Sequence, residues 1–296
     1  ASVVLNLLLL YAIRRFTKKS LGAYKQLLTI FAAFDIFLTL LHAVVKPKVV
    51  IIGTTFGVGC IFEDRRMTSF YCSCFTVPFA LMVIHFIYRF WSIRHPDLIS
   101  LFSNKKFIAA ISLYPVMAFV VWIVLAYYGA TGEGEEIGKT FLREEYRRRY
   151  GLERREGWLI MNHWENESFN VLPFVTLFCV DVIMVMSFST AATLGGLTFY
   201  YINQTDAVSL QSHNLQLKLF IAVTAQWNGI VFIIFKFILF QTLVPLVFVY
   251  IPYICVINFP FFRLPIFYMD DACMVLTSCF PAWDAVIMIM LIKDYR

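Results

Sequence analysis

The sequence has few charged residues for its length. Charged side chains make up 15% of its 296 residues, whereas soluble domains contain about a quarter. Hydrophobic residues make up 60%, and the mean hydropathy is +0.74. This composition excludes a cytoplasmic enzyme, and the 31 Phe and 15 Tyr exclude a disordered chain.

Clusters of residues that would support chemistry or nucleic-acid binding are also missing. The net charge of +6 is spread over the segments between apolar runs, so it forms no continuous basic face. The five histidines lie on separate segments, and none has the spacing to Glu that makes a zinc helix. We therefore expect no metal, no cofactor, no nucleic-acid partner and no enzymatic activity.

The seven cysteines do not form an even disulfide framework. Several lie inside apolar runs, where a thiol behaves as a small hydrophobic group. Cys60 with Cys72 or Cys74 is a candidate local disulfide if that face is extracellular. A reduced structural role is the alternative, and the sequence leaves both open.

Long apolar runs account for most of the chain. A bilayer crossing needs about 20 apolar residues, and lipid requires the backbone to satisfy its own hydrogen bonds, so we expect helices. This predicts an all-α membrane protein, a single seven-transmembrane helix bundle over 1–296, with a solvated loop at 129–170. The expected spans are 1–13, 27–45, 69–88, 107–128, 171–200, 236–262 and 272–292.

Two of these spans have unusual lengths. Only about thirteen residues precede Arg14, so we expect a truncated first helix and a start that belongs to a fragment or a shortened gene model. The run 217–262 is about twice as long as one crossing needs, so the sixth helix is abnormally long or the run holds extra sequence.

Basic residues alone do not orient the chain. With an odd number of spans, Lys and Arg are divided evenly between the two faces, so the positive-inside rule gives no decision. Three acidic residues lie within spans, where an ionisable group is costly and normally faces a cavity or a partner. Asp35, Asp181 and Asp284 can line an ion path in a transporter or channel, or hydrogen-bond within the bundle.

The end of the third span carries a recognisable pattern. His85 to Trp91, with Pro96 after it, resembles the end of the third helix in nematode seven-transmembrane chemoreceptors of the serpentine Str-like class. Further matching stretches occur in the right order along nearly the whole chain. They are Asn6–Leu9, Leu21–Lys25, Leu215–Phe220, Gln241–Pro245, Tyr250–Pro252, Phe280–Asp284 and Ile292–Arg296.

This resemblance implies a G-protein-coupled chemosensory, olfactory-type receptor for a small external chemical, which signals to a heterotrimeric G protein. It also implies a multi-pass protein of the plasma membrane, with the sensory cilium as one expected place. The N-terminus is then extracellular and the C-terminus cytoplasmic. A transporter or channel that uses Asp35, Asp181 and Asp284 is the alternative, and a nonfunctional receptor relative is a third interpretation.

Under this interpretation the candidate site residues fall into three groups. A guanidinium at the cytoplasmic end of a span can reach water and meet a partner protein, so G-protein coupling is assigned to Tyr88, Arg89, Arg94 and Pro96. Proline removes a backbone hydrogen bond, so the conformational switch is assigned to Pro245, Pro252, Pro281 and Asp284. The ligand pocket is assigned to aromatic residues near the outer ends of the spans: Phe75, Phe79, Phe174, Phe178 and Tyr253.

The sequence differs from related patterns in three places. No acidic residue directly precedes Arg89, which argues against an ionic lock there. Residues 129–170 contain no cysteine, so a disulfide to the third helix cannot form. The family pattern fits the sixth span if Phe220 is joined to Lys236, and we hypothesise that 221–235 is an insertion from a gene-model error, which as helix adds about 22 Å.

Overall fold

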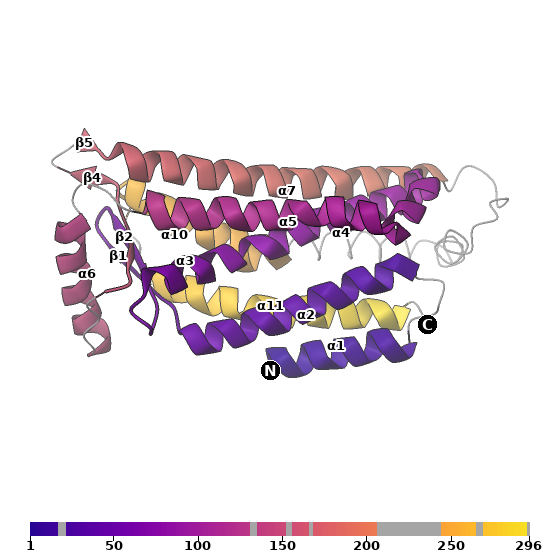
Figure 1. The fold of residues 1–296 in the computed structure, drawn as a ribbon, viewed down its shortest axis with the longest axis horizontal. Coiled ribbons are helices and arrows are strands. Elements are labelled where there is room, and N and C mark those ends of the chain that lie inside the picture. The colour runs from indigo at the N-terminus through magenta and orange to yellow at the C-terminus, as the bar shows by residue number, and fades with distance from the viewer. Residues whose placement is uncertain are drawn as a thin grey trace.

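The computed structural model describes residues 1–16, 22–130, 135–151, 156–165, 168–205, 244–264 and 269–294. They form a bundle of long helices with a small sheet and a short helix at one end (Figure 1). We call that end the sheet end and the opposite end, where the fourth helix finishes at Arg94, the Arg89 end. The proposed insertion 221–235 and the start of the sixth span lie outside the described residues.

The bundle is built from apolar helices. They are α1 (Ser2–Phe16), α2 (Gly22–Val45), α3 (Arg65–Cys74), α4 (Thr76–Arg94), α5 (Lys105–Val124), α7 (Val171–Thr205), α10 (Ile251–Phe261) and α11 (Met269–Asp294). Within the described residues, five stretches are long and apolar enough to cross a bilayer: Tyr24–Val45, Arg65–Arg94, Lys105–Gly129, Val171–Tyr201 and Asp271–Ile289. Leu246–Phe261 is a shorter apolar helix.

The third span is longer than the sequence predicts. It begins at Arg65 rather than residue 69, because the Asp64 carboxylate accepts a hydrogen bond from the Arg66 backbone N–H at 2.8 Å and caps the helix. Phe75 separates α3 from α4. At the Arg89 end, Pro96 opens the short 3₁₀ helix η2 (Pro96–Ser103) after α4 has ended.

The segment 129–170 is not the solvated loop that the sequence suggests. It contains α6 (Glu135–Tyr150), β3 (Leu159–Asn162) and the small hairpin β4 (Trp164–Glu165) and β5 (Ser168–Phe169). Strand β3 pairs antiparallel with β2 (Thr55–Gly59), which pairs antiparallel with β1 (Lys48–Ile52). Gly53, with a φ of 55°, supplies the left-handed residue of the two-residue turn between β1 and β2.

The sheet has a bundle face and an α6 face. Val50 and Ile160 pack against Leu142 and Tyr146 of α6, while the alternate residues of the strands face the bundle. Gly57 lies between Val50 and Ile160 in the register, and a Cβ there would lie 2.6 Å from Leu142 Cδ1. The sheet is thus a layer between α6 and the ends of the helices (Figure 1).

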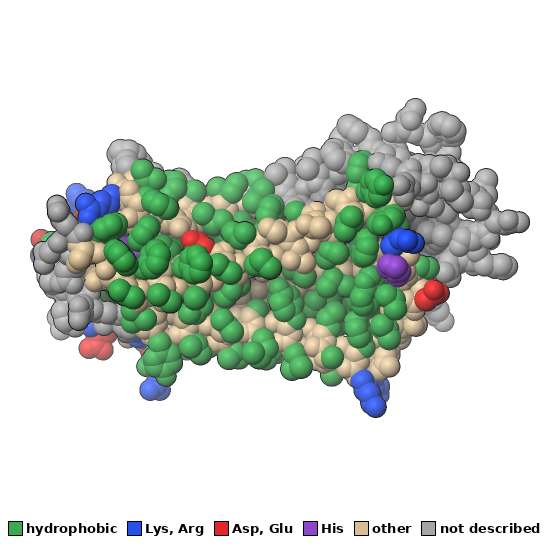
Figure 2. Space-filling model, turned by 90° about the horizontal axis from the view of Figure 1, so that it is seen from above, with side chains coloured by type: hydrophobic (Ala, Val, Ile, Leu, Met, Phe, Trp, Pro, Cys, Tyr) green, Lys and Arg blue, Asp and Glu red, His purple; other side chains and the backbone are tan. Residues whose placement is uncertain are grey.

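The sides of the bundle are apolar. Figure 2 shows hydrophobic side chains along the length of one face, with charged side chains mostly at the two ends. On α5, Leu113, Val116, Met117 and Val120 are all exposed. A soluble bundle would bury such residues, so this distribution fits a protein whose sides face lipid.

Candidate functional site

An apolar cavity lies at the sheet end. Its volume is about 70 Å³, and both the sheet and the helices form its walls. The sheet contributes Val49, Phe56, Val58, Leu159 and Met161, and the helical segments contribute Tyr71, Cys72, Trp122, Ala126, Ala130, Thr176, Val180, Tyr253, Val256, Ile257, Cys273 and Met274. Within the described part of the chain, no charged side chain lines this cavity. It is a site for uncharged groups.

The five aromatic residues assigned to the ligand pocket lie in two environments. Tyr253 lines the cavity, and the buried Phe75 has its ring centroid 6.1 Å from that of Tyr253. Phe79 is also buried, and its ring centroid lies 4.4 Å from that of Tyr250, three residues before Tyr253. Phe174 and Phe178 are 36% and 61% exposed on α7 and are not among the lining residues.

Hydrogen bonds connect the third span to the segment 129–170, where no disulfide can form. Arg65 Nη2 donates to the Tyr127 and Ala130 carbonyls at 2.7 and 3.0 Å. The Thr68 hydroxyl donates to the Gly157 carbonyl at 2.9 Å. Gly157 has a φ of 79°, and a Cβ on it would lie 2.3 Å from the Glu63 carbonyl carbon. We call α6 and the sheet the layer above the cavity. This layer is therefore attached to the start of α3 by close backbone contact.

The candidate local disulfide is not formed. Cys60, Cys72 and Cys74 are free thiols, and Cys60 and Cys74 are buried. Cys72 instead lines the cavity as an apolar side chain.

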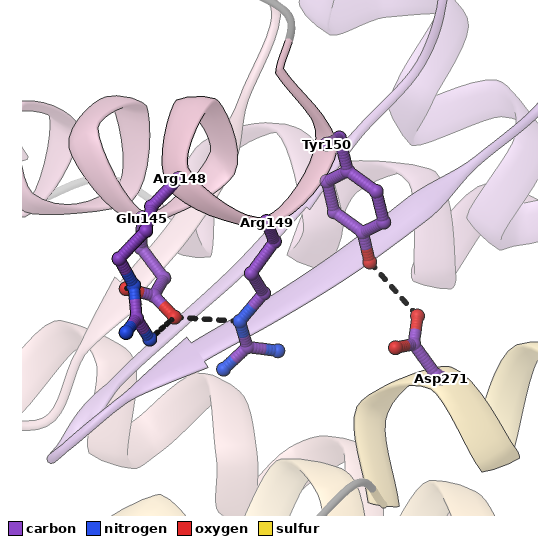
Figure 3. A network of polar contacts seen from close by, with 5 residues as sticks. All are labelled: Glu145, Arg148, Arg149, Tyr150 and Asp271. Carbon is purple, nitrogen blue, oxygen red and sulfur yellow. Dashed lines mark hydrogen bonds and ion pairs between the residues drawn. The ribbon is translucent and has the colours of Figure 1, made fainter.

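Helix α6 is attached to the start of α11 by a hydrogen bond (Figure 3). The Tyr150 hydroxyl donates to Asp271 Oδ1 at 2.8 Å. On α6 itself, Arg148 and Arg149 both bond to the Glu145 carboxylate at 2.5 to 2.7 Å. Hydrogen bonds from Arg148 and then Arg149 lower the pKa of Glu145 to about 2, so this carboxylate stays charged at any physiological pH.

An aromatic cluster at the sheet end joins the β4–β5 hairpin to α7 and α10. Trp164 donates its indole N–H to the Phe261 carbonyl at 2.7 Å and stacks on the Phe261 ring, and Arg263 lies over Trp164 at 4.3 Å. His163 is 1% exposed, and neither ring nitrogen has a hydrogen-bond partner among the described residues. Its burial lowers the pKa to about 4, so the imidazole is neutral.

Arg89 bonds to a tyrosine rather than to an adjacent acid. Its Nη2 donates to the Tyr24 hydroxyl on α2 at 2.7 Å, and the same oxygen lies 2.8 Å from His85 Nε2. Tyr24 also stacks on Tyr88, with centroids 5.1 Å apart. Asp284 on α11 interacts electrostatically with Arg89. Tyr24 thus contacts His85, Tyr88 and Arg89 of α4 at once, and Asp284 adds an acidic group near the guanidinium.

The other residues assigned to coupling lie at the same end. Arg94 lies over the Tyr201 ring of α7 at 5.1 Å, which connects the ends of α4 and α7. Pro96 is the first residue of η2, and Phe102 of η2 packs on Tyr88 at 4.9 Å. Tyr88, Arg89, Arg94 and Pro96 therefore lie together at one end of the bundle.

The three span aspartates do not share one surrounding. Asp35 and Asp284 are 2% and 7% exposed and interact electrostatically with each other. Asp181 instead accepts a hydrogen bond from Asn258 of α10 at 3.0 Å. Throughout the described ranges, no three His, Cys, Asp or Glu side chains are grouped to hold a metal ion.

Two of the three prolines assigned to the switch lie beside irregular helix, whereas Pro281 lies inside the regular helix α11. Pro245 and Pro252 flank η4 (Leu246–Tyr250), a π-helical segment that leads into α10. The Tyr250 hydroxyl is buried in this segment and has no hydrogen-bond partner within the described residues. On α11, the Pro281 carbonyl accepts a hydrogen bond from Asn6 of α1 at 2.9 Å. π-Helical turns commonly occur at functional sites, and proline makes the segment easier to bend.

Comparison with known proteins assigns this arrangement to a class. The family model described as serpentine type 7TM GPCR chemoreceptor Str matches residues 1–235 and 232–296. The chain belongs to this family of seven-transmembrane receptors. The prediction of a nematode Str-like chemoreceptor with a helical membrane fold is thereby confirmed.

Curated nematode receptors are similar over most of the chain. "Serpentine receptor class r-10" of Caenorhabditis elegans is 24% identical over 297 residues, covering 94% of this chain and 80% of that receptor. The protein of the same name from Caenorhabditis briggsae is 24% identical and covers 98% and 84%. "G-protein coupled receptor str-33" of Caenorhabditis elegans is 22% identical and covers 100% and 85%.

Sequence reasoning missed the residues of the sheet that line the cavity. A signal for β1 and β2 exists, because β-branched residues flank the Gly53–Thr54 turn. Strand β3 carries little signal of its own, since its partner lies about a hundred residues away in β2. Tyr24 was also missed as the partner of Arg89, although the stretch that contains it resembles the family pattern.

Proposed function

We propose that this chain is a chemosensory receptor that binds a small external chemical at the sheet end and activates a heterotrimeric G protein at the Arg89 end. One observation carries the proposal: the apolar cavity and the contact of Arg89 with Tyr24 lie at opposite ends of the same helices. Membership of a receptor family supports ligand and G-protein partners in general.

The sheet end then faces outside the cell. In this orientation α1 and α11 both finish at the cytoplasmic Arg89 end (Figure 1), which agrees with an extracellular N-terminus and a cytoplasmic C-terminus. We propose the plasma membrane as the location, with the sensory cilium as the compartment that external chemicals reach first.

The mechanism is a shift between two arrangements of the helices. A ligand that binds the active arrangement more tightly than the resting one changes their populations. Contacts with Tyr253 act on α10 just beyond η4, where Pro245 and Pro252 weaken the helix. Bending at η4 changes the packing of Tyr250 on Phe79 of α4, Arg89 leaves Tyr24, and the exposed guanidinium meets the G protein.

The experiment is substitution of Arg89 in the full receptor. Arg89→Ala should abolish ligand-evoked GTP exchange at unchanged surface expression, while Lys106→Ala, an exposed residue near the same face, should leave it intact. Full signalling by Arg89→Ala would refute the role given to Arg89.

Transport is the competing function. The mutual interaction of the buried Asp35 and Asp284 supports it, whereas the bond of Asp181 to Asn258 does not extend that pair. Ligand flux into proteoliposomes without G protein would favour transport, and ligand-dependent GTP exchange would favour the receptor. Absence of both activities in the correctly localised protein would favour the nonfunctional relative.

A further inference from the structure

We propose that the cavity binds an uncharged, mainly hydrocarbon molecule of about five to seven non-hydrogen atoms, and that the sheet, rather than the helices alone, sets the maximum length of that molecule. This inference rests on the proposed receptor function, because it identifies the ligand that the receptor would detect.

The lining selects the charge of the ligand. Within the described residues, the cavity is lined by apolar side chains and by three hydroxyls, with no charged group. Two of those hydroxyls are already engaged, since Tyr71 bonds to His42 Nδ1 at 2.8 Å and Thr176 donates to the Leu172 carbonyl at 2.9 Å. An ionic ligand would lose its hydration without gaining a counter-charge, so the cavity favours a neutral molecule with few polar atoms.

The volume selects the size of the ligand. One water-sized group needs roughly 10–15 Å³ of such space, so a cavity of about 70 Å³ holds about five to seven of them. Each methylene that fits should raise affinity about fourfold, because burying one is worth about 0.8 kcal/mol. A methylene that does not fit should lower it.

The strand register makes the sheet a selective wall. Leu159 and Met161 of β3 line the cavity, while Ile160 between them packs against α6. Met161 and Ile160 are 5% and 2% exposed, so both are fully packed. Substitution of either residue by Ala removes three side-chain heavy atoms. Only Met161→Ala enlarges the cavity, because Ile160 does not line it.

The test uses the purified receptor in nanodiscs and straight-chain primary alcohols from ethanol to decanol. Dissociation constants are measured by ligand-observed NMR without G protein, with empty nanodiscs as the blank. The wild-type receptor should bind more tightly with each added carbon up to about seven non-hydrogen atoms and more weakly beyond. Met161→Ala should move this maximum up by about three atoms, and Ile160→Ala should leave it in place.

A second variant keeps the test decisive if Met161→Ala does not fold. Ala126→Leu adds three heavy atoms on the helical wall and should move the maximum down by about three atoms. Absence of alcohol binding, equal binding of the carboxylates of the same chain lengths, or equal shifts for Met161→Ala and Ile160→Ala would overturn the inference.

The readout separates this inference from the receptor function. Length-selective binding without any GTP exchange would leave the ligand class standing and reject signalling. Exchange driven by ligands without a length limit, or by charged ones, would support signalling and reject the ligand class.

Discussion

Tyr24→Phe should raise the basal activity of the receptor. The Tyr24 oxygen is bonded to Arg89 Nη2 at 2.7 Å and lies 2.8 Å from His85 Nε2. The variant keeps the ring, and therefore the stacking on Tyr88, but removes the group that holds the guanidinium. The proposed mechanism gives this contact to the resting arrangement alone. Its loss therefore destabilises the resting arrangement and raises the population of the active one.

The size of the effect follows from the charge on Arg89. A hydrogen bond to a charged group contributes about 1.5–3 kcal/mol, and 1.36 kcal/mol is a factor of ten, so the ratio of active to resting receptor should rise about 10- to 150-fold. A receptor that is roughly 1% active at rest would then be roughly 10% to 60% active.

The assay is ligand-free GTP exchange in membranes with matched surface expression. Tyr11→Phe on α1 is the matched control, because it removes the same atom from a side chain that is 61% exposed. Basal exchange of Tyr24→Phe equal to that of wild type and of the control would refute a resting contact between Tyr24 and Arg89.

Two further predictions concern the layer above the cavity. Gly157→Ala and Gly151→Ala both force Ala into a left-handed conformation, at about 1–2 kcal/mol each, but only at Gly157 does the new Cβ meet backbone atoms of Glu63 and Asp64. Hydrogen exchange in β3 should therefore accelerate more in Gly157→Ala, and equal rates in the two variants would contradict the close contact. The pKa of His163, about 4 against an ordinary 6.5, means that the folded layer tolerates only the neutral imidazole. The stability of the folded layer is therefore full above pH 6.5 and falls by about 3 kcal/mol as the pH drops toward 4. Hydrogen exchange of this layer, corrected for the intrinsic pH dependence of exchange, should accelerate on acidification. His163→Phe should remove that acceleration.

The helices were predictable because their signal is local. A run of about 20 apolar residues has few alternatives to a membrane helix, and capping by Asp64 shows why the third span begins before its apolar run. It was harder to predict which residues of a helix are exposed on the side of the bundle and which are buried inside it. Because α7 is apolar on all sides, its sequence does not distinguish the exposed Phe178 from the buried Val180 two residues later.

The sheet and the partner of Arg89 depend on contacts between distant parts of the chain. Val58 pairs with Leu159, and Tyr24 meets Arg89 across two helices. Neither contact follows from spacing within one segment. The sequence therefore predicted that Arg89 lies at one end of the bundle, but not that a tyrosine of α2 holds it there.

The irregular helix η4 lies next to the cavity and packs on α4, so it connects the cavity with the helix that carries Arg89. Tyr253 lines the cavity, and three residues earlier Tyr250 packs on Phe79 at 4.4 Å. Phe79 belongs to α4, the same helix that carries Arg89, so Tyr250 lies between the cavity and the rigid helix that ends at the coupling face. In the proposed mechanism, a ligand that displaces Tyr253 therefore pushes on a π-helical segment that prolines make easier to bend. The buried Tyr250 hydroxyl has no hydrogen-bond partner among the described residues, so we expect the contact of Tyr250 with Phe79 to differ between the two arrangements.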